Sequence, residues 1–161
     1  MSFHSMKYSR LTKEQFEELH EEFINFLATQ SITGSEWEEI KRVKPDVAED
    51  ELDIFSDLIW EGVLNNATYL ENISAKQLFL FKVEESFMKL IVIKTTNEKI
   101  DFTTVEGYKW LQKNFAYEEV EFFTANKDFT GKKNEDIFSL VQQGAIITNG
   151  ALFNFFNDIV N

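Results

Sequence analysis

The stretch QLFLFKVEESFMKLIVIKTT, Gln77 to Thr96, decides the fold class of this chain. Two runs rich in apolar and β-branched residues flank the polar triplet 84–86, a pattern typical of two strands joined by a tight turn. Both runs are largely apolar at consecutive positions, so side chains on both faces of the sheet should be buried. The stretch predicts an antiparallel hairpin with helices packed on both sides.

Weaker patterns continue on either side of this hairpin. TYLENIS, from Thr68, predicts a strand before it, and KIDFTT, from Lys99, predicts a short strand after it. TVEGYKWLQKNF then predicts a helix and EEVEFFTA a strand. NEDIFSLVQQG predicts a helix that Asn134 caps and Gly144 ends, and NGALFNFFNDIV predicts a last helix.

The first part of the chain has helical periodicity instead. Thr12 and Gln15 have the spacing of a capping box, and apolar residues recur at helical intervals after them, which predicts a helix over 12–30. A second, short helix should begin after Ser35 and end at Pro45. VAEDELDIFSDLIWEGVLNNA predicts a third helix.

These patterns together predict an α+β fold in a single domain over residues 6–161. About three helices occupy residues 6–66, and residues 67–161 form a mostly antiparallel sheet with helices packed on it and two C-terminal helices. A chain of 161 residues with 17 phenylalanines can bury a substantial core. Residues 1–5 are expected to be a leader or a cloning remnant.

Composition excludes several classes of function. The chain has no cysteine, which excludes disulfides, zinc–thiolate sites, iron–sulfur clusters and cysteine nucleophiles, and which fits a reducing cytoplasm. A net charge of −12 disfavours binding to a phosphate backbone, so we expect no nucleic-acid partner. No apolar run is long enough to span a bilayer, so we expect a cytoplasmic protein without a membrane partner.

Acidic clusters offer two weak metal sites. Glu17 and His20 have the Glu-x-x-His spacing of di-iron bundles, but a second copy of the motif is missing because His4 is the only other histidine. Glu49 and Asp53, with Asp57, share a helical stripe, which the favourable effect of acids near a helix N-terminus mostly explains. We expect no metal ligands and no cofactor.

Catalytic motifs are likewise incomplete. The order of elements resembles a nuclease core, but Val92 stands where such a core needs an acid before Lys94. FTGKKNED, from Phe129, lacks the upstream glycine of a phosphate loop. We therefore predict no catalytic and no cofactor-binding residue, although an enzyme that uses carboxylates stays open as an alternative.

Excess apolar surface is the more informative signal. The last helix is apolar on two sides, which indicates either deep burial or docking to a partner. Tryptophan is a frequent interface anchor, and one lies off the main apolar face of the third helix. The candidate interface residues are Trp60, Phe153, Phe156 and Val160.

Three long segments carry a resemblance to a known family. KYSRLTKEQFEELHEEFINFLATQSIT, ELDIFSDLIWEGVLNNATYLE and IFSLVQQGAIITNG resemble a family of small acidic proteins from Bacteroidetes and flavobacterial genomes, over nearly the whole chain from Met6. That family is conserved and of unknown function. The resemblance implies a cytoplasmic bacterial protein and transfers no activity, cofactor or catalytic residue.

The leading hypothesis from the sequence is a non-enzymatic, acidic protein-interaction or adaptor domain, with a protein partner or a second copy of itself in a homodimer. One alternative is a small-molecule-binding domain, or an enzyme using carboxylates. It predicts a pocket of a few hundred cubic ångströms between the first helices and the sheet, and a carboxylate with a raised pKa. A third hypothesis is an immunity-type inhibitor of a basic partner.

Overall fold

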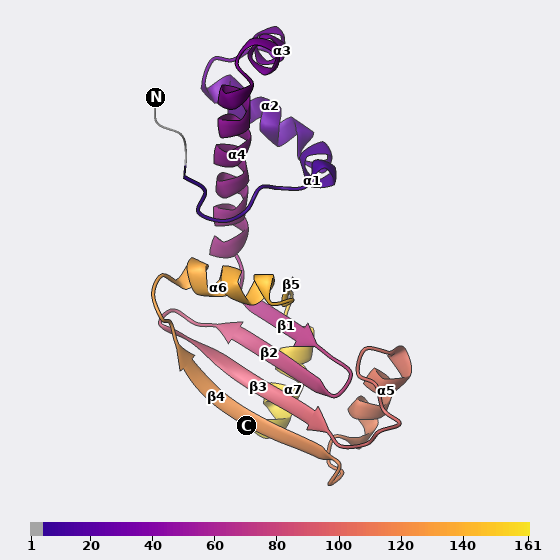
Figure 1. The fold of residues 1–161 in the computed structure, drawn as a ribbon. Helices are drawn as coiled ribbons and strands as arrows, with labels where there is room; N and C mark the ends of the chain where they lie inside the picture. The colour runs from indigo at the N-terminus through magenta and orange to yellow at the C-terminus, as the bar shows by residue number, and fades with distance from the viewer. Residues whose placement is uncertain (1–4) are drawn as a thin grey trace. The chain divides into compact units, whose positions relative to one another are not determined.

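The computed structural model describes residues 5–161 and has the predicted α+β fold. The chain divides into two compact units, a helical unit that ends at Val63 and a sheet unit from Leu64 to Asn161 (Figure 1). The division falls close to the change in sequence pattern near Asn66. Each unit has its own buried apolar cluster.

The helical unit contains four helices where the sequence predicted three. The predicted helix over 12–30 is interrupted at Leu19, whose backbone (φ −100°, ψ 24°) leaves the helical region. The capping box of Thr12 and Gln15 is present in both directions. The helices are α1 (Lys13–Glu18), α2 (His20–Thr29), α3 (Gly34–Val43) and α4 (Pro45–Asn65), of which the last extends just past the unit boundary.

One predicted helix boundary in this unit was wrong and one was confirmed. Thr33, rather than Ser35, caps α3, because its hydroxyl accepts a hydrogen bond from the backbone N–H of Glu36 at 3.2 Å. The predicted end at Pro45 is confirmed, because α3 ends at Val43, and Pro45 is itself the first residue of α4. Proline suits that position because the first backbone N–H of a helix has no intrahelical partner.

Aromatic rings fill the core of the helical unit. The ring of Phe23 meets the rings of Phe55 and Trp37 edge to face, with centroids 5.0 and 5.2 Å apart. Such pairs add to the free energy gained by burial alone. The buried members of this cluster are Leu11, Phe23, Leu27 and Phe55.

An extended segment before α1 is fastened along α4. The Asp57 carboxylate accepts hydrogen bonds from the backbone N–H groups of Lys7 at 2.8 Å and Tyr8 at 3.0 Å. Arg10 pairs with Asp53 and with Glu49 on the same helix. These contacts explain the acidic stripe on α4 as a binding surface for the chain's own N-terminal segment.

The sheet unit is built on the predicted hairpin. Its five antiparallel strands are β1 (Tyr69–Ile73), β2 (Gln77–Val83), β3 (Phe87–Thr95), β4 (Val120–Asp128) and β5 (Ile146–Thr148), in the order β4-β3-β2-β1-β5. The three-residue strand β5 was not predicted. The helices of this unit are α5 (Val105–Asn114), α6 (Lys133–Gln142) and α7 (Ala151–Val160).

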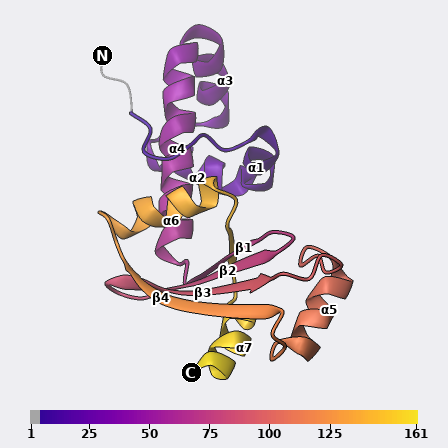
Figure 2. The ribbon, with the colours of Figure 1, turned by 60° about the horizontal axis from the view of Figure 1, so that its bottom comes forward.

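Helices lie on both faces of this sheet, as the hairpin sequence predicted. Figure 2 shows α6 on one side of the strands and α5 and α7 on the other. Alternate residues of β2 and β3 supply the core beneath α5 and α7, and these include Leu78, Leu80, Ile91 and Ile93. The α7 face of the sheet is the one that bears the groove described below.

Two further local predictions were wrong. KIDFTT forms turns rather than a strand, because Phe102 donates to the carbonyl of Ala75 and Thr104 caps α5. The backbone of Gly107 lies so close to Asp101 that an added Cβ would come within 1.8 Å of the Asp101 carbonyl oxygen. In α6, Lys132 occupies the N-cap position predicted for Asn134.

Candidate functional site: a groove between the last helix and the edge strand

A groove of about 630 Å³ lies on the sheet between α7 and β4. It exists because α7 covers only part of the edge strand. Phe156 of α7 packs against Phe122, with ring centroids 5.9 Å apart, whereas Thr124 and Asn126 farther along β4 are exposed. The groove is open to solvent above these two residues.

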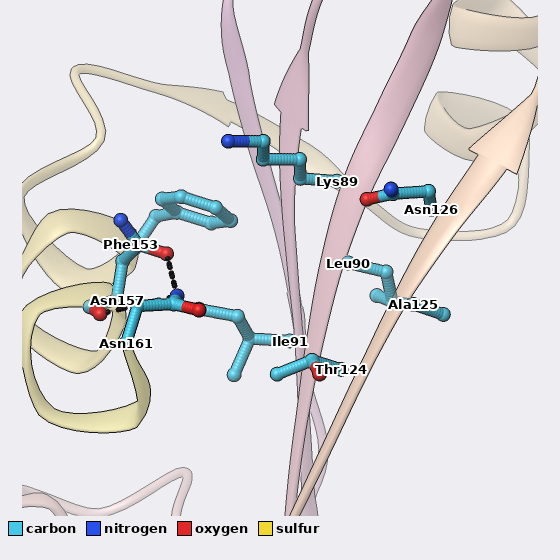
Figure 3. A pocket seen from close by; sticks show the side chains of 9 residues that line it. All are labelled: Lys89, Leu90, Ile91, Thr124, Ala125, Asn126, Phe153, Asn157 and Asn161. Atoms are coloured by element: carbon cyan, nitrogen blue, oxygen red, sulfur yellow. Dashed lines mark hydrogen bonds between the residues drawn. The ribbon is translucent and has the colours of Figure 1, made fainter.

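The groove has an apolar floor and a polar rim. Ile91 and Phe153, both buried, form its apolar part. In Figure 3 the Asn126 amide points from β4 towards β3, and Lys89 extends from β3 towards α7. The polar residues of the lining are Lys89, Thr124, Asn126, Asn157 and Asn161.

Asn157 near the end of α7 and Asn161 at its C-cap are bonded to each other. The side-chain amide of Asn161 donates to the Asn157 side-chain oxygen at 2.6 Å (Figure 3). This bond engages the side-chain oxygen of Asn157. The side-chain N–H groups of Asn157 have no protein partner among residues 5–161. Amide N–H groups of this kind donate hydrogen bonds to water or to a ligand. The rim therefore offers hydrogen-bond donors to a bound molecule.

Lys89 gives the groove a local positive charge. Its register partner on β2 is another lysine, Lys82, on the same face of the sheet. Like charges directly opposite across two strands destabilise a sheet. Lys82 is compensated by Glu84, at 3.5 Å, and by the ring of Tyr69. Lys89 makes no ion pair or hydrogen bond through its ammonium group within the described chain.

Two smaller cavities lie on the opposite face of the sheet, beside α6. Their volumes are about 240 and 140 Å³. The larger is lined mainly by apolar side chains such as Phe79, Phe81 and Leu140. Neither combines a large volume with several polar groups, so the groove beside α7 is the stronger candidate for a binding site.

The predicted interface residues lie mainly in the two cores. Phe153 and Phe156 are 2% and 0% exposed, so core burial, the alternative considered from the sequence, applies to both. Val160 packs against the same cluster, and half-buried Trp60 packs against the core of the helical unit. The apolar side chains that α7 leaves exposed are Phe155 and Ile159.

Candidate metal residues are engaged elsewhere. Among residues 5–161, no group of three or more His, Asp or Glu side chains is placed to hold an ion. Glu49 and Asp53 bind Arg10, and Glu17 and His20 lie on different helices. His4 lies outside the described residues. One carboxylate, that of Glu71, has a pKa raised by burial, and it is not part of the groove lining.

The chain is a small α+β protein with an open, polar-rimmed groove of about 630 Å³ between α7 and β4. Over residues 6–161 the chain matches a family described as "Family of unknown function (DUF6495)", and it belongs to that family. The sequence resemblance is thereby confirmed in its main point, a family of unknown function covering the chain from Met6. Comparisons with curated proteins and with solved structures gave no match. No helix within the described residues is long and apolar enough to cross a membrane.

Proposed function

We propose that this protein is a non-catalytic binding protein of the bacterial cytoplasm, and that the groove between α7 and β4 holds a small organic anion. The carrying observation is Lys89, an ammonium group without a protein partner in the described chain, opposite a second lysine. The chain has 28 acidic residues that could neutralise this charge, yet none of those in the described chain pairs with Lys89. An anionic ligand would supply the missing counter-charge.

The lining specifies the ligand further. An anionic head would bind Lys89 and accept hydrogen bonds from the amides of Asn126 and Asn157, and an apolar body would cover Ile91 and Phe153. The rim contains only a lysine, a threonine and asparagines, a set suited to holding a ligand rather than to paired acid and base work. We therefore propose binding without turnover.

The test is a thermal-shift screen of small carboxylates and phosphates that carry alkyl or aromatic groups, followed by calorimetry on the hits. Lys89→Gln should weaken binding of a hit about 10- to 100-fold, the usual effect of losing a hydrogen bond to a charged group. Lys99→Gln, at an exposed loop lysine, is the matched control and should leave affinity unchanged. Equal affinity in Lys89→Gln, or no hit at all, would refute the proposal.

A second proposal is the acidic interaction or adaptor function expected from the sequence. It is favoured by the exposed side chains Phe155 and Ile159 on α7 and by the net charge of −12, which together suit a partner with a basic, partly apolar surface. An immunity-type inhibitor would use the same features. Pull-down from cytoplasm at low and high salt tests it, because such a partner should be lost as salt screens the charges.

A further inference from the structure

The outer edge of β4 is an open template for strand pairing. The strand forms one end of the sheet, and within residues 5–161 no other strand pairs with that edge. Its pairing with β3 is unbroken over nine residues, and every residue from Phe123 to Asp128 is exposed. A long, regular and exposed edge of this kind favours pairing with another strand.

We propose that this edge binds the same edge of a second copy of the chain, so that two β4 strands pair antiparallel around a two-fold axis at Thr124. Thr124 is the midpoint of Val120–Asp128, so this register pairs the strand over its whole length. A two-fold axis perpendicular to the sheet keeps each residue on its own face, and shifting the centre by one residue would leave strand ends unpaired.

Charge and size are self-complementary in this register. Glu121 of one copy lies opposite Lys127 of the other, twice by symmetry, and both side chains are on the face that bears α6. The half-exposed ring of Phe123 lies opposite Ala125, a small residue that leaves room for it. Opposite charges across paired strands stabilise the pairing and select its register.

The pairing would also complete the groove. On the α7 face, Phe122 of the second copy would lie opposite Asn126, on the open side of the groove. The second copy would then supply the missing outer wall. The dimer rests on the strand edge alone, so a failure of the ligand proposal would leave it standing.

Charge reversal tests the dimer. Light scattering across a concentration series should show twice the 18.9 kDa chain mass for the wild type. Lys127→Glu should weaken association at least about tenfold, because it sets two pairs of like charges face to face. Glu121→Lys with Lys127→Glu keeps the net charge of −12 and should restore the dimer. Thermal unfolding of each variant checks that the fold survives.

Cross-linking tests the register. The chain has no cysteine, so Thr124→Cys introduces a single thiol that should lie opposite its own symmetry mate. The expected Cα separation of about 4.5–5.5 Å is within reach of a disulfide. Phe123→Cys is the matched control, because its symmetry mates would lie diagonally and link poorly. A monomer at high concentration, or faster linking by Phe123→Cys, would overturn the proposal. If the protein is a monomer, the charges of Glu121 and Lys127 would instead serve to keep other strands from pairing with this edge.

Discussion

Lys89 should cost the folded protein stability in the absence of a ligand, and its removal should show this cost. Lys82 and Lys89 are register partners, so their Cβ atoms lie about 5 Å apart. With the flexible ammonium groups about 6 Å apart in water-like surroundings, Coulomb repulsion is about 0.7 kcal/mol. We expect Lys89→Gln to raise the free energy of unfolding by about 0.5 kcal/mol, or the melting temperature by about 1–2 °C.

The assay is urea or thermal unfolding of wild type, both single variants Lys82→Gln and Lys89→Gln, and the double variant at low salt. The cycle isolates the repulsion, because the effect of Lys89→Gln should vanish once Lys82 is gone. The gain should also fade in about 1 M salt, where the screening length is about 3 Å. Lys99→Gln is the control and should give no gain.

A destabilised Lys89→Gln, or a gain that salt does not reduce, would refute this reasoning. The first result would mean that the ammonium group has favourable contacts in the folded protein. The second would mean that packing of the new side chain, and not charge, causes the change. A confirmed gain in stability together with a loss of ligand affinity would show that the lysine is kept for binding.

Two other predictions concern substitutions elsewhere in the chain. Gly62→Ala should stabilise the helical unit by about 0.5–1 kcal/mol, because an added Cβ on this exposed helical glycine meets nothing within 4 Å. Gly107→Ala should destabilise the protein by about 1–3 kcal/mol, because its Cβ would clash with the Asp101 carbonyl. Urea unfolding measures both, and equal effects would contradict the structure. Burial raises the pKa of Glu71, so its ionisation should destabilise the folded state increasingly as pH rises from 4.5 through the raised folded pKa. Glu71→Gln should therefore stabilise the protein at pH 7 and leave it unchanged near pH 3.5, and a gain that is independent of pH would rule out ionisation as its cause.

Most of the fold could be predicted from periodicity. Continuous apolar runs identified β2 and β3 because both faces of those strands are buried. Strand β5 was missed because three residues carry no measurable alternation. KIDFTT was misread because Ile100 and Phe102 alternate as in a short strand, whereas the Phe102 backbone N–H donates to the Ala75 carbonyl and its side chain is buried in the core.

The groove was not predicted, because its residues come from β3, β4 and α7 and share no motif. One signal was available. A two-residue turn at Glu85–Ser86 pairs Lys82 with Lys89, and that register places two like charges together in a strongly acidic chain, whereas a three-residue turn over 84–86 would pair Lys82 with Met88. The burial of Phe153 and Phe156 could not be separated from an interface role, because either use requires the same apolar surface on the helix.

The fastening of the N-terminal segment to α4 also bears on how the chain matures during synthesis. Lys7 leaves the ribosome first, but Asp57, which accepts its N–H, follows 50 residues later. At about 5–20 residues per second, Asp57 is made roughly 3–10 seconds after Lys7. Phe23 and Leu27 likewise stay exposed until Phe55 of the same cluster has been made, and apolar surface that is transiently exposed in this way is prone to aggregate.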